Sequence, residues 1–177
     1  MRGAGRWVAR VMLTVLVSAE SAMQPLVATF RSLMGATLEG LVSDVMVRGP
    51  AALRPVCEPA GASLAEDGEA VEAVLREARG RWLLALEAGA VPHEGWEAAV
   101  ARHVARSGSA ARFRVAEPSL WRALVGRRRR PLRAGLLLPM EVARAGMRDG
   151  APDTLAIGRA AATLDVRLTP ARDDPTR

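Results

Sequence analysis

Apolar residues recur every three or four positions over several stretches of the chain, which is the spacing of one face of an α-helix. The clearest stretch starts at Pro25, a residue suited to the first position of a helix, and ends at Gly49-Pro50. Its apolar members are Leu26, Val27, Phe30, Leu33, Met34, Leu38, Leu41, Val42 and Val45. This spacing predicts one long amphipathic helix that runs from Pro25 to Val45.

Two further stretches predict helices of ordinary length. Ser63, with Glu66 at the third position after it, is typical of a capping box, so we expect a helix that continues through Trp82 and Leu86. A second helix is expected over residues 92–106, before the Ser-Gly-Ser sequence that follows.

The second half of the chain predicts shorter elements. Helices are expected over residues 118–125, 139–148 and 153–164, each opened by a Pro or Asp. Residues 112–115 alternate between Arg and apolar side chains and predict a short strand, for which the sequence offers no convincing partner.

These elements together predict an all-α fold, a small array or bundle of about six short helices. Residues 23–168 would form a single helical domain, with a Pro- and Gly-rich linker at 49–62. Residues 169–177 contain prolines and several charges, and we expect a disordered tail there.

The first 22 residues have the order of features of a secretory signal. Three arginines come first, Arg2, Arg6 and Arg10. An apolar run from Val11 to Val17 and the small residues Ser18 and Ala19 follow, so the candidate cleavage lies between Ala19 and Glu20. The run is at the short end for a signal and far below the roughly 20 residues of a membrane-spanning helix. We therefore expect no integral membrane span.

Two other interpretations of this segment stay open. Helical spacing is also followed by six apolar residues, which suits a retained amphipathic helix: Trp7, Val8, Val11, Met12, Val15 and Leu16. An arginine-rich start without acids is also typical of an organelle transit peptide. A cleaved signal would make the protein secreted or periplasmic; otherwise we expect a cytoplasmic protein, or a nuclear one in a eukaryotic or viral setting.

The composition indicates very GC-rich coding DNA, of a bacterium or a DNA virus. The chain has no Lys, Asn or Tyr, so that all 25 basic residues are Arg, and its formal net charge is +6. Because codon bias explains this arginine content, the content alone does not indicate nucleic-acid binding. The bias also raises the alternative that the chain is a poorly constrained product of an overlapping reading frame.

Four adjacent arginines, Arg127, Arg128, Arg129 and Arg130, form the sharpest local feature. Guanidinium groups this close repel one another unless an anion meets them, so the cluster is a candidate site for nucleic acid or another polyanion. The alternative is a solvated junction between two helices.

Candidate enzyme chemistry is sparse. There is no Walker A sequence, and the Gly61–Ala65 approach to a nucleophile elbow follows no predicted strand. His93 and Glu97 stand four residues apart on a predicted helix, which falls short of the three ligands of a catalytic zinc site. The sequence therefore predicts no catalytic residue, no metal and no cofactor.

The function that these patterns favour is that of a non-enzymatic helical protein, exported if the signal is cleaved, that contacts an unknown protein partner. The contact surface would be the apolar face of the first long helix, laid into a groove of the partner. Its members are Phe30, Leu33, Met34, Leu38 and Leu41. Polyanion binding by the arginine cluster is the alternative function.

Overall fold

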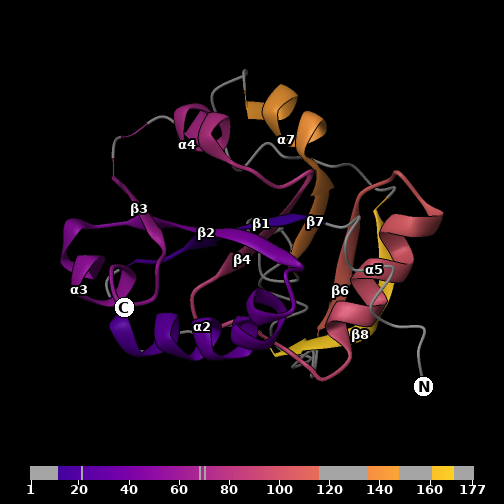
Figure 1. Cartoon of the computed structure of the whole chain (residues 1–177), viewed down its shortest axis with the longest axis horizontal. Coiled ribbons are helices and arrows are strands. Elements are labelled where there is room, and N and C mark those ends of the chain that lie inside the picture. Colours follow the sequence, from indigo (N-terminus) through magenta and orange to yellow (C-terminus); the bar gives the residue numbers. More distant parts are fainter. Residues whose placement is uncertain are drawn as a thin grey trace, which may run out of the picture.

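The fold is α/β and is built around one sheet of eight strands with helices on both faces (Figure 1). It is taken from a computed structural model, which describes residues 12–20, 22–67, 69, 71–115, 135–147 and 161–169. The prediction of an all-α bundle is therefore wrong. The predicted helix at 118–125, residues 153–160 of the helix predicted over 153–164, and the tail beyond Thr169 lie outside the described residues. The end of the helix predicted over 153–164 is wrong, because residues 162–164 belong to a strand.

The strands of the sheet follow the order β3-β2-β1-β4-β7-β6-β8-β5. They are β1 (Leu13–Ser18), β2 (Val42–Gly49), β3 (Ser63–Glu66), β4 (Trp82–Glu87), β5 (Val91–Pro92), β6 (Ala111–Val115), β7 (Leu136–Pro139) and β8 (Ala162–Thr169). The first four are mutually parallel, with β1 between β2 and β4. Strand β7 is antiparallel to β4 and β6, β8 is parallel to β6, and β5 is antiparallel to β8.

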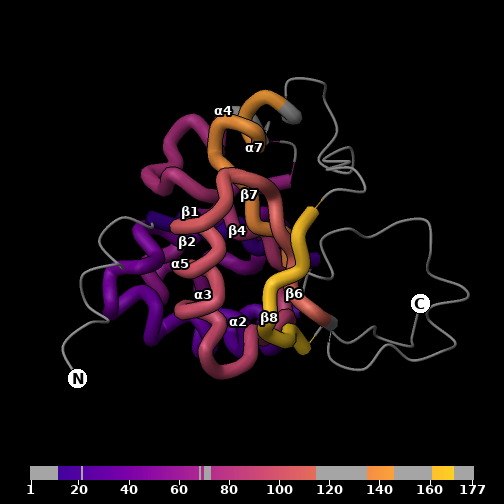
Figure 2. Tube along the Cα trace, turned by 90° about the vertical axis from the view of Figure 1, so that its right-hand side faces the viewer, coloured from indigo at the N-terminus to yellow at the C-terminus, as the bar shows by residue number. Residues whose placement is uncertain are grey.

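The helices cover the two faces of the sheet, as Figures 1 and 2 show from two directions. They are α2 (Met23–Leu38), the 3₁₀ turn η1 (Ala51–Leu53), α3 (Arg54–Cys57), α4 (Val71–Glu77), α5 (Trp96–Arg106) and α7 (Met140–Met147). Buried side chains of α2, α3 and α5 belong to the larger apolar cluster, and those of α4 and α7 to the smaller cluster on the other face. Within the described residues, no helix is both long enough and apolar enough to span a membrane.

Strands β1 and β4 are buried on both faces, which is why the sequence misled the prediction. Along β1, Leu13, Val15 and Val17 point into the larger cluster and Leu16 into the smaller one. A parallel strand covered on both sides is apolar at nearly every position. Such a run cannot be distinguished by period alone from a buried helix or a short signal core.

The place of β1 does not fit the signal-peptide interpretation. The apolar run to Val17 forms this strand, paired along its whole length with β2 and β4. Cleavage between Ala19 and Glu20 would remove β1 from the middle of the parallel strands. A secreted mature chain that begins at Glu20 is not consistent with this fold.

The long helix predicted from Pro25 to Val45 ends earlier, at Leu38. Gly40, with φ of 75°, follows its C-cap. The amide of Gly40 donates to Thr37 O (3.1 Å), and the amide of Leu41 donates to Ala36 O (2.9 Å). This is the Schellman arrangement, which a glycine permits because it adopts the left-handed conformation at no steric cost. The chain then turns back into β2.

Other predicted elements divide between correct and wrong assignments. The helix over 92–106 is confirmed as α5, the helix after Pro139 as α7, and the short strand as β6, whose partners are β7 and β8. The capping-box assignment is wrong, because Ser63–Glu66 is strand β3 and residues through Leu86 divide between α4 and β4. The segment 49–62 contains η1 and α3, which bury Leu53 and Cys57.

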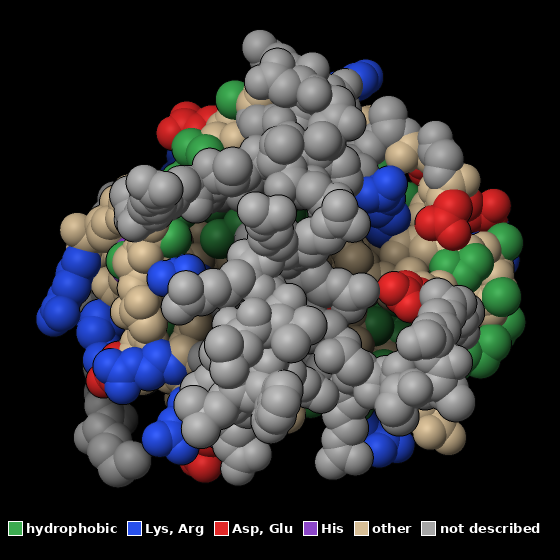
Figure 3. Space-filling view, turned by 180° about the vertical axis from the view of Figure 1, so that it is seen from behind, with side chains coloured by type: hydrophobic (Ala, Val, Ile, Leu, Met, Phe, Trp, Pro, Cys, Tyr) green, Lys and Arg blue, Asp and Glu red, His purple; other side chains and the backbone are tan. Residues whose placement is uncertain are grey.

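One stretch of the sheet keeps a charged face. On β6 and β8 the core side chains alternate with exposed ones, and Arg112, Arg114 and Arg167 are among the latter. Figure 3 shows arginine side chains gathered along the side of the molecule where α5, β6 and β8 lie. Asp165 meets Arg114 at 3.5 Å, but both side chains are largely exposed, so this pair contributes little to stability.

Candidate functional site at the carboxyl ends of the strands

The topology of the sheet indicates which of its edges is suited to bind a ligand. From β1 the chain moves outward to β2 and β3, and it then returns to place β4 on the other side of β1. In open α/β sheets, ligands bind outside the carboxyl ends of the strands at the point where the strand order reverses. Here that point lies beyond the ends of β1 and β4.

The ends of β1 and β4 bring two acidic residues to this edge. Ser18 pairs with Glu87 in the register of the two strands, and the amide of Ala88 donates to Ser18 O at 2.9 Å. Glu20 follows β1 and is exposed, whereas Glu87 is half-buried. Carboxylates in these positions can accept hydrogen bonds from ligand hydroxyl groups or take a proton from one.

The turn after Glu87 is held firmly in place. The amide of Ala90 donates to Glu87 O at 2.9 Å, and Gly89 has φ of 92°, the left-handed value that a type II turn requires at its third residue. The fully buried Thr29 hydroxyl of α2 accepts from the Gly89 amide (2.9 Å) and donates to Ala90 O (3.0 Å). The backbone around Glu87 is therefore fixed by the helix that follows β1.

The start of α2 lies at the same edge. Its N-cap, Ala22, provides no side-chain cap, and its first turn has no acidic residue. The free backbone N–H groups of a helix start and its dipole favour an anion. Half-buried Arg48, the penultimate residue of β2, adds a cation at this edge, where it pairs with Ser18 in the register of β1 and β2 and so shares a face of the sheet with Ser18 and Glu87. This side of the edge therefore suits a negatively charged group.

Gly49 keeps the ends of β1 and β2 close together. A Cβ atom at this position would lie 2.5 Å from Ala19 O and 2.8 Å from Leu53 Cδ1. Farther out, Arg54 of α3 pairs with Glu66 at the end of β3, and both side chains are well exposed. The edge thus carries carboxylates that follow or end three strands, namely Glu20, Glu66 and Glu87.

No metal site is formed by the part of the chain that the structure describes. No group of three or more His, Cys, Asp or Glu side chains in those residues could hold a metal ion. His93, one of the pair considered from the sequence, instead has its Nε2 2.8 Å from Thr169 Oγ1.

Cys57 is buried, and this burial raises the pKa of its thiol. The positive charge of Arg54 opposes this rise, and the negative charge of Glu58 adds to it.

The other residues singled out from the sequence do not come together at this edge. Arg127, Arg128, Arg129 and Arg130 lie outside the described residues. The expected contact face of the first helix is divided by the fold. Leu33 and Leu41 are core residues, Phe30 is half-buried, and Met34 and Leu38 are exposed by 58% and 84%.

Glu87 and its neighbour Ser18 were missed from the sequence. The available signal was an apolar run, Trp82–Leu86, that is followed by the acidic Glu87 and, two residues later, by Gly89. That is a strand followed by a turn, but the run was assigned to a helix, so Glu87 was not recognised as a strand end.

Neither a family model nor a curated protein sequence matches the chain. Solved structures of glucosyl-3-phosphoglycerate synthase from Mycobacterium tuberculosis do share its fold. The complex with Mn²⁺, UDP and glucosyl-3-phosphoglycerate has a TM-score of 0.64 at 13% identity, over 96% of this chain and 75% of that chain. The complex with Mn²⁺ and UDP-glucose gives 0.65 at 14%, over 96% and 74%. The complex with phosphoglyceric acid gives 0.65 at 14%, over 99% and 79%.

These likenesses correct the expected function. The prediction of a non-enzymatic interaction protein depended on an all-α fold, whereas the chain is α/β and its structural neighbours are an enzyme. A poorly constrained reading frame is set aside with it, because the likeness extends over nearly the whole chain. Polyanion binding by Arg127, Arg128, Arg129 and Arg130 stays an untested prediction, because these residues lie outside the described part of the chain. At this level of identity, what the chain shares with glucosyl-3-phosphoglycerate synthase is the fold.

Proposed function

We propose that the chain is a glycosyltransferase that binds a nucleotide-sugar donor at the carboxyl ends of β1, β2 and β4. The observation that carries the proposal is the pairing of Ser18 with Glu87 at the point where the strand order reverses. The supporting comparison is a fold shared with an enzyme whose structures contain UDP and UDP-glucose.

The charges at this edge suit the two parts of such a donor. The diphosphate would lie toward the start of α2 and Arg48, where uncapped N–H groups and a cation favour negative charge. The sugar would lie toward Glu87, whose carboxylate can accept hydrogen bonds from its hydroxyl groups.

The reaction breaks the bond between the anomeric carbon and the diphosphate oxygen. The electron pair leaves with the nucleoside diphosphate, and the oxygen of an acceptor hydroxyl bonds to the anomeric carbon. The proton of that hydroxyl must pass to a base, and we assign this role to Glu87. Its half-buried position and fixed turn hold a carboxylate in one place, as a general base requires.

Some structures of the mycobacterial enzyme hold Mn²⁺ or Mg²⁺ beside UDP. The described residues of this chain include no group of three or more His, Cys, Asp or Glu side chains that could hold a metal ion by themselves. The proposal therefore includes no step through a metal.

The test uses the purified full chain with UDP-glucose, and then with the GDP, ADP and dTDP sugars, each with and without Mn²⁺. Donor binding is measured by calorimetry, and slow transfer of the sugar to water is measured as release of the nucleoside diphosphate. Glu87→Gln should lower that release by about 10²- to 10⁴-fold, since it removes the base. Glu39→Gln, an exposed change at the C-cap of α2, is the control and should have no effect.

Two results would overturn the proposal. One is a failure to bind any of these donors. The other is donor turnover that Glu87→Gln and Glu39→Gln change equally, because the turnover would then not depend on the carboxylate at the end of β4.

A further inference from the structure

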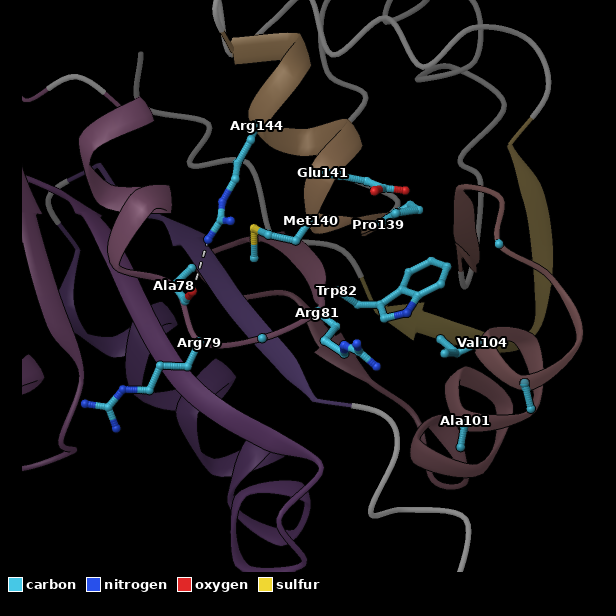
Figure 4. A pocket seen from close by; sticks show the side chains of 13 residues that line it. Ala78, Arg79, Arg81, Trp82, Ala101, Val104, Pro139, Met140, Glu141 and Arg144 are labelled. Atoms are coloured by element: carbon cyan, nitrogen blue, oxygen red, sulfur yellow. Dashed lines mark hydrogen bonds between the residues drawn. The ribbon is translucent and has the colours of Figure 1, made fainter.

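A second concave site lies at the opposite edge of the sheet. It is an open cavity of about 800 Å³ around the amino end of β4, bounded by α5, the end of β7 and the start of α7. Figure 4 shows it with Trp82 at its centre. Trp82 and Glu87 are the two ends of β4, which places the cavity about 17 Å from the proposed donor site.

The loop that forms the floor of this cavity is held by buried polar groups. The Thr14 hydroxyl, fully buried, accepts from the Gly80 amide at 2.9 Å and donates to the Asp44 carboxylate. The amides of Arg81 and Trp82 both donate to Met12 O, at 2.8 and 3.1 Å. The positions of the Arg81 and Trp82 backbones therefore do not depend on their own side chains.

The cavity has an excess of positive charge. Arg79, Arg81 and Arg144 line it, against the single carboxylate of Glu141. Arg144 donates to the carbonyl oxygens of Leu75 and Ala78 at 3.1 and 3.2 Å, so its charge is fixed at the rim. In Figure 4 the Arg79 side chain points away from Trp82, whereas the Arg81 side chain extends below the indole ring.

Arg81 is the cation best placed to meet a ligand. Within the described part of the chain its guanidinium has no acidic partner, because the two ion pairs found there involve Arg54 and Arg114. A guanidinium presents a planar set of donors that matches a phosphate or carboxylate.

The remaining wall of the cavity is apolar. Trp82, Val104, Ala101, Pro139 and Met140 contribute to it. The Trp82 ring is held edge-on to the His103 ring, with the centroids 6.3 Å apart. A ligand that fits this cavity has an anionic group at one end and a planar or apolar body at the other.

We infer that this cavity binds a small organic anion, which is a phosphate monoester or a carboxylate with an aromatic or apolar body. The anionic group meets Arg81, and the body lies against Trp82, Val104 and Pro139. The inference does not depend on the proposed transferase activity, because no residue is common to the two sites.

The experiment titrates the full chain with phenyl phosphate, benzoate, inorganic phosphate and phenol by calorimetry, at two salt concentrations. We expect phenyl phosphate to bind more tightly than inorganic phosphate or phenol, and more weakly as the salt concentration rises. Binding of benzoate as well would assign the site to organic anions in general; binding of phenyl phosphate without benzoate would assign it to phosphates. In amide NMR spectra, Arg81 and Trp82 should shift, and Ser18 and Glu87 should not.

Substitutions of charged side chains test which of them contacts the anionic group of the ligand. Arg81→Gln should weaken phenyl phosphate binding about 10- to 100-fold, as expected for loss of a charge-assisted hydrogen bond, and Arg81→Lys should restore part of it. Glu141→Gln should tighten binding about 2- to 5-fold by removing a like charge. Arg112→Gln, an exposed change on β6, is the matched control.

Three outcomes would overturn the inference. They are no binding of phenyl phosphate or benzoate, binding that Arg81→Gln and Arg112→Gln affect equally, and equal binding of inorganic and phenyl phosphate. The last would mean that the apolar wall plays no part.

Discussion

Thr29 shows how one buried hydroxyl can connect the core to the candidate site. It lies on α2, yet both of its long-range hydrogen bonds go to the turn after Glu87. Valine has nearly the same shape but would leave the Gly89 amide and the Ala90 carbonyl without this partner. An unpaired buried polar group costs about 1–3 kcal/mol.

We therefore expect Thr29→Val to lower the free energy of unfolding by about 1–3 kcal/mol, measured by urea denaturation. It should also weaken binding of UDP-glucose if the turn positions Glu87. Thr37→Val on the same helix is the control, because Thr37 is exposed and bonds within its own helix, to Leu33 O. Equal losses in the two variants would contradict the part assigned to Thr29.

Gly80 and Gly35 give opposite expectations for the same substitution. A Cβ on Gly80 would lie 2.2 Å from Thr14 N and 2.6 Å from Leu13 C, which are backbone atoms of a central strand. Gly80→Ala should therefore destabilise the protein by about 1–3 kcal/mol or more. Gly35 lies within α2 with nothing within 4 Å of such a Cβ, so Gly35→Ala should stabilise by about 0.5–1 kcal/mol. Thermal unfolding of both variants checks the signs, and a stable Gly80→Ala variant would contradict this close packing.

At the scale of the element, the sequence predicts the amphipathic helices well and the buried strands poorly. Helices α5 and α7 have one apolar and one polar face, so their spacing is visible along the chain. Strands β1 and β4 have no polar face, and so they lack the alternation that identifies a strand. The end of α2 was missed because Val42 and Val45 continue its spacing by chance, although Gly40 was a stop signal.

The sites were harder to predict than the elements, because each combines residues from separate elements. Glu87 is recognised as a candidate site residue only when β4 is known to lie beside β1, and the order of strands in the sheet shows that it does. Arg81 and Glu141 share a cavity because β7 is antiparallel to β4, which carries the start of α7 to the amino end of β4. The spacing of residues within one segment predicts neither that β4 lies beside β1 nor that α7 begins near the amino end of β4.

At the scale of the whole molecule, β1 connects the two sides of the sheet. It pairs with β2 on one side and with β4 on the other, and it contributes to both apolar clusters. A chain without this strand would leave β2 and β4 with unpaired edges and a gap between them.

We therefore expect the chain shortened by residues 1–19 to lack cooperative unfolding and dispersed amide NMR signals, with the full chain as the control. Val15→Asp should have the same effect, since it buries a charge in the larger cluster, whereas Met12→Asp, at a residue 40% exposed, should fold. A folded protein that starts at Glu20 would contradict the place of β1 and restore the signal-peptide interpretation.

The edge strand β5 has a consequence for how this protein folds during synthesis. Val91–Pro92 pairs with β8, which begins at Ala162 and ends at Thr169. At about 5–20 residues per second, a ribosome needs about 4–15 s to add the residues between Pro92 and Thr169. For that time the growing chain has strands whose partners do not yet exist, so it is open to aggregation and to binding by chaperones. Completion of the sheet therefore waits until β8 has been synthesised, and a ribosome that stalls before Ala162 leaves β5 and β6 without the strand that joins them.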